Sequence, residues 1–164
     1  MVAIVAIDNR NGIGKDGHLL FHIRDDMRHF RNLTMDKIVV MGRKTFESLP
    51  NKEPLPHREN YIITRQKDYA VDGAHVVHSV DELIEQVGES DDVCIIGGGE
   101  IYEMFLPYYN RLYVTRINAN TEADTFFFNI DREIWKYNEA ESSDLLYDDK
   151  SNCNYSFDVL DRVK

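Results

Sequence analysis

The chain has 164 residues and a formal net charge of −10, and it contains no run of about 20 apolar residues that could span a membrane. This length suits one domain with its own core, and 43% apolar residues exclude a disordered chain. The negative charge argues against nucleic acid as a partner, because binding it requires basic side chains that neutralise phosphates. The two cysteines, Cys94 and Cys153, cannot form a disulfide framework, so we expect a reducing, cytoplasmic setting.

Six short apolar runs predict the strands of a central sheet. In chain order they are "VAIVAI", "KIVVMG", "NYIITR", "AHVVHS", "VCIIGG" and "RLYVTRI". The first run lacks a basic leading segment and continues directly into Asp8, so it predicts a strand rather than a signal peptide. Between the runs, helical composition is found in residues 25–34, 43–49, 79–88 and 99–106.

The order of these elements predicts the fold class. Strand and helix alternate until about residue 106, which indicates parallel strands joined by crossovers. After that point only strand patterns remain, and "WKYNEAES" and "NYSFDVLDRV" predict an antiparallel pair. We therefore expect an α/β fold in a single domain spanning residues 1–164. The central sheet should be mostly parallel, with about eight strands, helices on both faces and an antiparallel C-terminal edge.

The segment "IRDDMRHF" places two adjacent acids at the start of a predicted helix. At ~100° per residue, Ile23, Met27 and Phe30 share one apolar face. Asp26 falls within this face, whereas Asp25 points nearly the opposite way, towards solvent. An acid in the first turn can complement the helix dipole while still reaching water. Alternatively, Asp26 is a cleft carboxylate that is held for a polar ligand and has a pKa raised by desolvation.

Three predicted strands end in residues suited to an anion. The segment "VCIIGGGEIY" passes through Gly97–Gly99 into a helix, so the backbone can approach a phosphate closely. The segment "VVMGRKTFESL" has Gly42, Arg43 and Lys44 at a similar junction, and "IITRQK" adds Arg65. Ligands of open α/β sheets lie beyond the carboxyl ends of the strands, so these junctions can converge on one anion site. Tight corners with ordinary surface charge are the alternative interpretation.

Seven segments resemble, in order and spacing, those of the dihydrofolate reductase family. They are "GIGKDG", "DDMRHFRNLT", "VVMGRKTFES", "PLPHREN", "IIGGGEIYEMFLP", "LYVTRI" and "EADTFF". The resemblance implies an enzyme that transfers a hydride from NADPH to C6 of 7,8-dihydrofolate while N5 gains a proton, giving tetrahydrofolate. It also implies that Asp26 anchors the pterin ring and raises its basicity, while water supplies the proton. The implied cofactor is NADPH. The six His residues include no pair with metal-ligand spacing, so no metal is expected.

The resemblance also assigns site residues, position by position. The catalytic set is Asp26, Leu19, Phe21, Tyr102 and Thr115. The substrate set is Ile4, Val5, Asp26, Met27, Phe30, Leu49, Leu55, Arg58, Ile96 and Thr115. The cofactor set is Ala6, Ile13, Gly14, Gly42, Arg43, Lys44, Thr45, Ile63, Thr64, Arg65, Ile96, Gly97, Gly98, Gly99, Glu100, Ile101 and Tyr102. Within these sets, Arg58 is implied to clamp the glutamate carboxylate, and the Gly97–Gly98 peptide is implied to be cis.

The chain departs from the family pattern in three places, one of which is Arg24, where a helix-starting proline is usual. Leu20-Phe21 stands where the family commonly has Pro-Trp, and phenylalanine cannot donate the hydrogen bond of an indole N–H. Glu100 stands where some members carry a cation near the 2′-phosphate of NADPH. Two other functions remain open: a reductase of a ribosylated aminopyrimidine in flavin synthesis, and a non-catalytic folate- or nucleotide-binding module. We expect a monomer whose partner is dihydrofolate, with no nucleic-acid or membrane partner.

Overall fold

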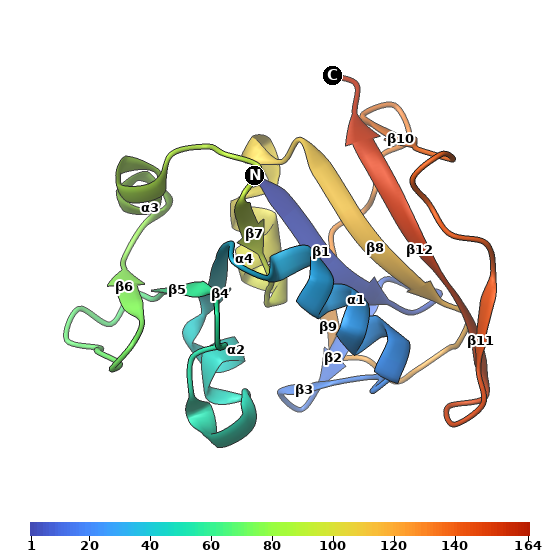
Figure 1. Cartoon of the computed structure of the whole chain (residues 1–164), viewed down its shortest axis with the longest axis horizontal. Helices are drawn as coiled ribbons and strands as arrows, with labels where there is room; N and C mark the ends of the chain where they lie inside the picture. Colours follow the sequence, from blue (N-terminus) through green and yellow to red (C-terminus); the bar gives the residue numbers. More distant parts are fainter.

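A nine-stranded sheet forms the centre of the computed structural model, which describes all 164 residues (Figure 1). Six of its strands coincide with the predicted apolar runs: β1 (Val2–Ile7), β4 (Ile38–Gly42), β5 (Glu59–Ile63), β6 (His75–Val77), β7 (Val93–Ile95) and β8 (Arg111–Ile117). These pair in parallel in the spatial order β8-β1-β7-β4-β5-β6. The antiparallel edge consists of β10 (Trp135–Tyr137), β11 (Leu146–Asp148) and β12 (Cys153–Arg162), with β12 beside β8. The predicted fold class is confirmed.

Helices occupy all four predicted segments. They are α1 (Arg24–Thr34), α2 (Arg43–Glu47), α3 (Val80–Val87) and α4 (Gly99–Met104). Two short 3₁₀ helices are also present: η1 (Pro50–Lys52) comes after α2, and η2 (Leu106–Tyr108) comes after α4. None of these helices is both long enough and apolar enough to cross a membrane.

The alternating residues of β1 show how the two faces of the sheet are covered. Val2 and Ile4 point to a face that packs against side chains of α1 and α2, including Phe46. Ala3 and Val5 point to the opposite face, which packs against α3 and α4 and forms the larger core cluster. Figure 1 accordingly shows α1 and α4 on opposite sides of the sheet. This alternation is what the period of two in a strand predicts.

A second, three-stranded sheet was not predicted from the sequence. It consists of β2 (Gly12–Lys15), β3 (His18–Leu19) and β9 (Thr125–Phe126), in the order β3-β2-β9. These strands are short and most of their residues are exposed or half-buried, so they lack the apolar alternation by which a strand is recognised. The small sheet follows β1 directly and therefore borders the carboxyl ends of the parallel strands.

Candidate active site

Asp26 lies in the first turn of α1 and is turned towards the sheet. Its Oδ1 accepts a hydrogen bond of 2.6 Å from the hydroxyl of Thr115, a residue of β8 with only 3% of its surface exposed. Oδ2 receives no hydrogen bond from the protein and remains accessible. No side chain caps the N-terminus of α1, so Asp26 does not act as a cap. The inward orientation predicted for Asp26 is confirmed.

The surroundings of Asp26 raise its pKa above the usual carboxyl value. Burial has the largest effect, the hydrogen bond from Thr115 opposes it, and the charge of Asp25 raises the pKa further. Tyr102 of α4 is buried nearby, and its hydroxyl donates to the carbonyl of Ile4 at 2.7 Å. Burial and the charge of Asp26 raise the pKa of Tyr102 as well. Asp26 is thus a single acidic group facing an accessible space and backed by neutral, buried partners.

Two other side chains of α1 differ from the sequence prediction. Asp25, predicted to face solvent, is half-buried and accepts a hydrogen bond of 2.8 Å from the hydroxyl of Tyr155 on β12. Because α1 lies across both β8 and β12, each of the two adjacent acids meets a hydroxyl donor. Met27, predicted on the apolar face, is 61% exposed. The protein buries α1 around Ile23 and Thr34 but leaves the turn that carries Met27 uncovered.

A positive group stands at the other end of α1. Arg58 donates from Nη1 to Thr34 Oγ1 at 3.1 Å and from Nε to the carbonyl of Pro56 at 2.9 Å, so Nη2 has no protein partner. Burial and the charge of Arg31 lower the pKa of Arg58. Thr34 follows Asp26 by eight residues, which is about 12 Å along a helix. The cleft beside α1 therefore has an acidic end and a basic end.

The three strand ends predicted from glycine and basic residues do come together. β7, β4 and β5 are neighbours in the sheet, and the Gly42 N–H donates to the Gly97 carbonyl at 2.9 Å. The Gly97–Gly98 peptide is cis, as the resemblance implied, and Gly97 has φ +123°, which L side chains rarely adopt. A Cβ on Gly99 would lie 3.0 Å from Thr125 Cγ2. A side chain would thus be strained at Gly97 and crowded against β9 at Gly99, whereas a Cβ on Gly98 would make only an ordinary contact, 3.5 Å from Thr45 Oγ1.

The arginines at these junctions are already paired with carboxylates. Arg43 contacts Glu47 one turn along α2, at 2.6 Å. Arg65 contacts Glu100 of α4 at 3.0 Å, and both side chains are largely exposed, at 88% and 70%. Lys44 is exposed and makes no ion pair within the protein. Positive charge is thus present where a phosphate was predicted, but most of it is balanced internally.

The remaining predicted residues differ in how far they are buried. Of the side chains that the resemblance assigns to the substrate, those of Ile4, Phe30, Leu49, Leu55 and Ile96 are buried or half-buried on the α1 face of the sheet, whereas the buried Val5 side chain points to the opposite face. Of the residues that the resemblance assigns to the cofactor, Ala6, Ile13, Gly14, Thr45, Ile63, Thr64 and Ile101 are buried or half-buried. Leu19 in β3 is 69% exposed, whereas Phe21 is half-buried and packs against the cluster of Ile23, Ile117 and Tyr155.

Three residues with charge or hydrogen-bonding roles near the cleft escaped the sequence prediction. Arg31 lies close enough to lower the pKa of Arg58. Because the chain is acidic overall, a basic residue on the same helix as Asp26 could have been noticed as part of an anion site. Tyr155 holds Asp25, but the two are far apart in sequence, so no local pattern joins them. Asp8 is buried at the turn after β1, a position where an acid is unusual and could have been noticed.

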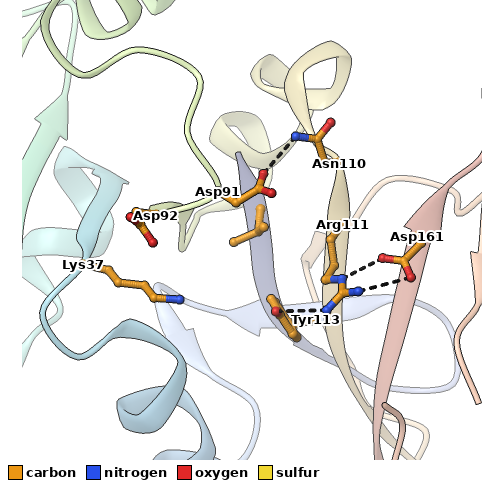
Figure 2. Close-up of a pocket in the computed structure, with 8 residues that line it drawn as sticks. Lys37, Asp91, Asp92, Asn110, Arg111, Tyr113 and Asp161 are labelled. Carbon is orange, nitrogen blue, oxygen red and sulfur yellow. Dashed lines mark hydrogen bonds and ion pairs between the residues drawn. The ribbon is translucent and has the colours of Figure 1, made fainter. Parts of the chain in front are cut away.

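A separate surface pocket of about 260 Å³ lies at the opposite end of the sheet, where the parallel strands begin (Figure 2). Its lining is largely charged, and three of its ionic groups already pair within the protein: Arg111 contacts Asp161 at 2.6 Å, and Asp91 contacts the Met1 ammonium at 3.3 Å. Lys37 also lines it. Because ligands of α/β sheets bind beyond the carboxyl ends of the strands, we place the functional site at the Asp26 end.

Comparisons with known proteins agree with this geometry. The family described as Dihydrofolate reductase matches residues 1–162. Dihydrofolate reductase of Staphylococcus haemolyticus is 34% identical over 161 residues, which are 98% of this chain and 95% of that protein. Dihydrofolate reductase type 3 of Salmonella typhimurium is 38% identical over 161 residues, 98% of this chain and 97% of that protein.

A solved structure of dihydrofolate reductase from Enterococcus faecalis, complexed with NADP(H) and RAB-propyl, shares the fold with a TM-score of 0.88. It is 32% identical, and the match covers 99% of this chain and 96% of that one. The match in sequence and the match in structure both extend over almost the whole chain. This chain belongs to the dihydrofolate reductase family.

Proposed function

We propose that this chain reduces 7,8-dihydrofolate to tetrahydrofolate with NADPH, and that Asp26 anchors the pterin ring. The observation that carries this assignment is the Asp26–Thr115 pair, in which the Thr115 hydroxyl holds one carboxylate oxygen and the other is free. The amino group and ring N–H of a pterin are donors that suit a carboxylate. Because the carboxylate is desolvated, its interaction with such donors is stronger than it would be in water.

Asp26 acts at a distance from the reacting atoms. Reduction requires a hydride at C6 and a proton at N5, and bound NADPH supplies the hydride. An ionised Asp26 at the far edge of the ring raises the basicity of the ring, so a water molecule can protonate N5. Thr115 fixes the direction of the carboxylate, and Tyr102 supports the floor of the site through its bond to the carbonyl of Ile4. Holding both reactants in one geometry removes much of the remaining barrier.

Arg58 binds the other end of the substrate in this proposal. Its Nη2 has no protein partner, and its position is fixed by Thr34 and Pro56, so the guanidinium can face a carboxylate. The spacing of about 12 Å along α1 suits a ligand with a pterin at one end and a glutamate at the other. The apolar side chains between these ends form the slot: Ile4, Met27, Phe30, Leu49, Leu55 and Ile96. Val5 points its side chain to the opposite face of the sheet and borders the slot only through its main chain.

The residues of the other side fit a nicotinamide dinucleotide. The glycine run carries no side chain, and one would be strained at Gly97 and crowded at Gly99, which suits a pyrophosphate that approaches the main chain. Arg43, Lys44 and Arg65 supply positive charge for the phosphates. The nicotinamide end is bounded by Ala6, Ile13 and Gly14, and the other cofactor-binding residues are Gly42, Thr45, Ile63, Thr64, Ile96, Gly97, Gly98, Gly99, Glu100, Ile101 and Tyr102. Leu19 and Phe21, at and after β3, border the same end.

We also propose that the enzyme works as a monomer in the cytoplasm, without nucleic-acid or membrane partners. Both cysteines are free thiols, and Cys94 is buried in β7, which suits a reducing compartment. The net charge of −10 opposes binding to anionic polymers. Light scattering at micromolar concentration should give a mass near 19.1 kDa. A mass of twice that value would contradict the monomer.

The direct test of function is loss of the nicotinamide absorbance when enzyme, NADPH and dihydrofolate are mixed. We expect saturable turnover of dihydrofolate with NADPH. Turnover of a ribosylated aminopyrimidine in place of dihydrofolate would favour the flavin-synthesis reductase instead. Binding of both ligands without turnover at any pH would make the chain a binding module.

A further inference from the structure

Asp8 is a buried carboxylate that accepts hydrogen bonds on both oxygens. It lies immediately after β1, and 4% of its surface is exposed. Oδ1 accepts from the backbone N–H groups of Arg10 at 2.8 Å and Gly12 at 2.7 Å. Oδ2 accepts from Thr121, from its N–H at 3.2 Å and from its hydroxyl at 2.6 Å. Three of these four donors are main-chain groups, which cannot turn away from the carboxylate.

The donors belong to two segments that are far apart in sequence. Arg10 and Gly12 form the turn between β1 and β2, and Thr121 lies in the loop that leads from β8 to β9. The two segments are also packed without space between them. A Cβ on Gly12 would lie 2.6 Å from Ala123 Cβ and 2.9 Å from Asp8 Oδ2. Asp8 therefore joins the turn to the loop. Two other contacts link the same segments: the Asn9 N–H donates to the Ala119 carbonyl at 3.0 Å, and Arg10 Nη2 donates to the Thr121 carbonyl at 3.2 Å.

The segments that Asp8 joins lead into the cofactor side of the cleft. The turn continues into Ile13, and the loop continues into Thr125 and Phe126 of β9, which pairs with β2. These residues lie against the glycine run. A Cβ on Gly99 would be 3.0 Å from Thr125 Cγ2, 3.1 Å from the Phe126 carbonyl and 3.8 Å from Ile13 Cδ1. The position of the small sheet over the glycine run therefore depends on how the turn and the loop are held.

We infer that Asp8 is a positioning residue for the nicotinamide cofactor: it holds the small sheet β3-β2-β9 in place over the glycine run, and it does not touch the pterin. This inference rests on the proposed function, because it assigns NADPH to the space beside the glycine run. Asp8 acts through the turn and the loop and makes no contact with the reacting atoms. Its loss should weaken NADPH binding and leave the Asp26 side of the cleft intact.

The site requires a carboxylate and not merely a polar group of the same shape. An amide in place of the carboxylate replaces one acceptor oxygen by an NH₂ donor, which would face at least one backbone N–H. A buried N–H without an acceptor is costly, so the turn or the loop must shift to relieve it. The ionised form is also the preferred one: burial raises the pKa of Asp8, but the hydrogen bonds from Thr121, Gly12 and Arg10 outweigh burial and hold it below its usual value.

The experiment compares Asp8→Asn with the wild type by calorimetric titration of NADPH and, separately, of dihydrofolate. We expect the dissociation constant for NADPH to rise about tenfold and that for dihydrofolate to stay near the wild-type value. In steady state, the KM for NADPH should rise while the KM for dihydrofolate does not. A merely structural role would weaken both ligands equally, and that result would overturn the inference.

Two further variants complete the test. Asp72→Asn makes the same change of charge in an exposed turn before β6 and should bind both ligands like the wild type. Thr121→Val removes only the hydroxyl donor, so it decides the question if Asp8→Asn does not fold, and it should weaken NADPH about threefold. Wild-type affinity for NADPH in both the Asp8 and the Thr121 variant would overturn the inference. If the wild type itself fails to bind NADPH, the proposed function is wrong as well. This result differs from failure of the inference alone, in which the wild type binds NADPH and the variants bind it equally well.

Discussion

The two sides of the cleft hold their charged groups in opposite ways. On the pterin side, the partners of the charged groups are neutral: Asp26 accepts from the hydroxyl of Thr115, and Arg58 donates to the hydroxyl of Thr34. On the phosphate side, each arginine already has a carboxylate, since Arg43 and Arg65 both form ion pairs. The two sides therefore differ in how much charge is left for a ligand.

A charge held by a neutral donor or acceptor keeps its full electrostatic effect, whereas a paired charge is partly balanced. The pterin side is therefore prepared for a ligand with a donor edge and a carboxylate. The phosphate side must exchange an internal carboxylate for the phosphate, and the free energy of that exchange reduces the affinity. Removing a charge should accordingly have opposite effects on the two sides. Loss of the charge at Asp26 or Arg58 should impair turnover or substrate binding, whereas loss of the charge at Glu100 should increase the affinity for NADPH.

Asp26→Asn should have the largest effect. The amide keeps the bond to Thr115 but loses the negative charge that raises the basicity of the pterin, so kcat should fall about 10²–10³-fold at neutral pH. Stopped-flow measurement of hydride transfer would show it, with NADPH affinity unchanged. Asp36→Asn, an exposed change just after α1, is the matched control. Unchanged turnover in Asp26→Asn would remove the assigned role.

Arg58→Leu should have the next largest effect. Loss of the guanidinium removes the partner of the glutamate carboxylate, so we expect the KM for dihydrofolate to rise about 30-fold, with little change in kcat. A pteridine without the glutamate provides the control, because its binding should be nearly the same in both enzymes. Equal losses for the two substrates would mean that Arg58 supports the fold of the cleft and does not bind the carboxylate.

The sequence predicted the fold better than it predicted the contacts of the site. The six apolar runs gave every parallel strand, because strands that are covered on both faces must be continuously apolar. The small β3-β2-β9 sheet was missed because its residues are mostly exposed and it is held by main-chain bonds and by Asp8. Local patterns carry no information about such a bond between distant segments.

Within the site, helical periodicity correctly predicted that Asp26 points inward, but its predictions for the adjacent Asp25 and Met27 were wrong. Asp25 is held by Tyr155, which comes from the other end of the chain, and Met27 is exposed because nothing covers that turn. Periodicity gives the direction of a side chain but not what lies opposite to it. The pairing of Arg65 with Glu100 could not be predicted from the sequence either, because Arg65 follows β5 and Glu100 lies in α4, far along the chain.

The raised pKa of Asp26 predicts that this residue lowers the stability of the fold. A carboxyl whose pKa is higher in the folded than in the unfolded state contributes its full stability to the fold below the unfolded pKa. This stability is lost as the pH rises through the folded pKa, because the buried group must then carry a charge. Asp26→Asn should therefore melt about 2–4 °C above the wild type at pH 7, corresponding to about 1 kcal/mol, and at nearly the same temperature at pH 3. Thermal unfolding followed by circular dichroism measures both. A variant less stable than the wild type at pH 7 would contradict the desolvation of Asp26.

Glu100→Gln should have the smallest effect, and it tests the phosphate side. The change frees Arg65, so affinity for NADPH should increase about threefold, a size typical of exposed ion pairs, while affinity for NADH stays the same because NADH lacks the 2′-phosphate. Glu103→Gln makes the same change of charge at an exposed position one turn along α4 and should alter neither affinity. Adding Arg65→Leu to Glu100→Gln should abolish the gain, since the two effects are coupled through one ion pair. If both nicotinamides gained equally, the effect would come from the overall charge, and the phosphate side would not be limited by its internal carboxylate.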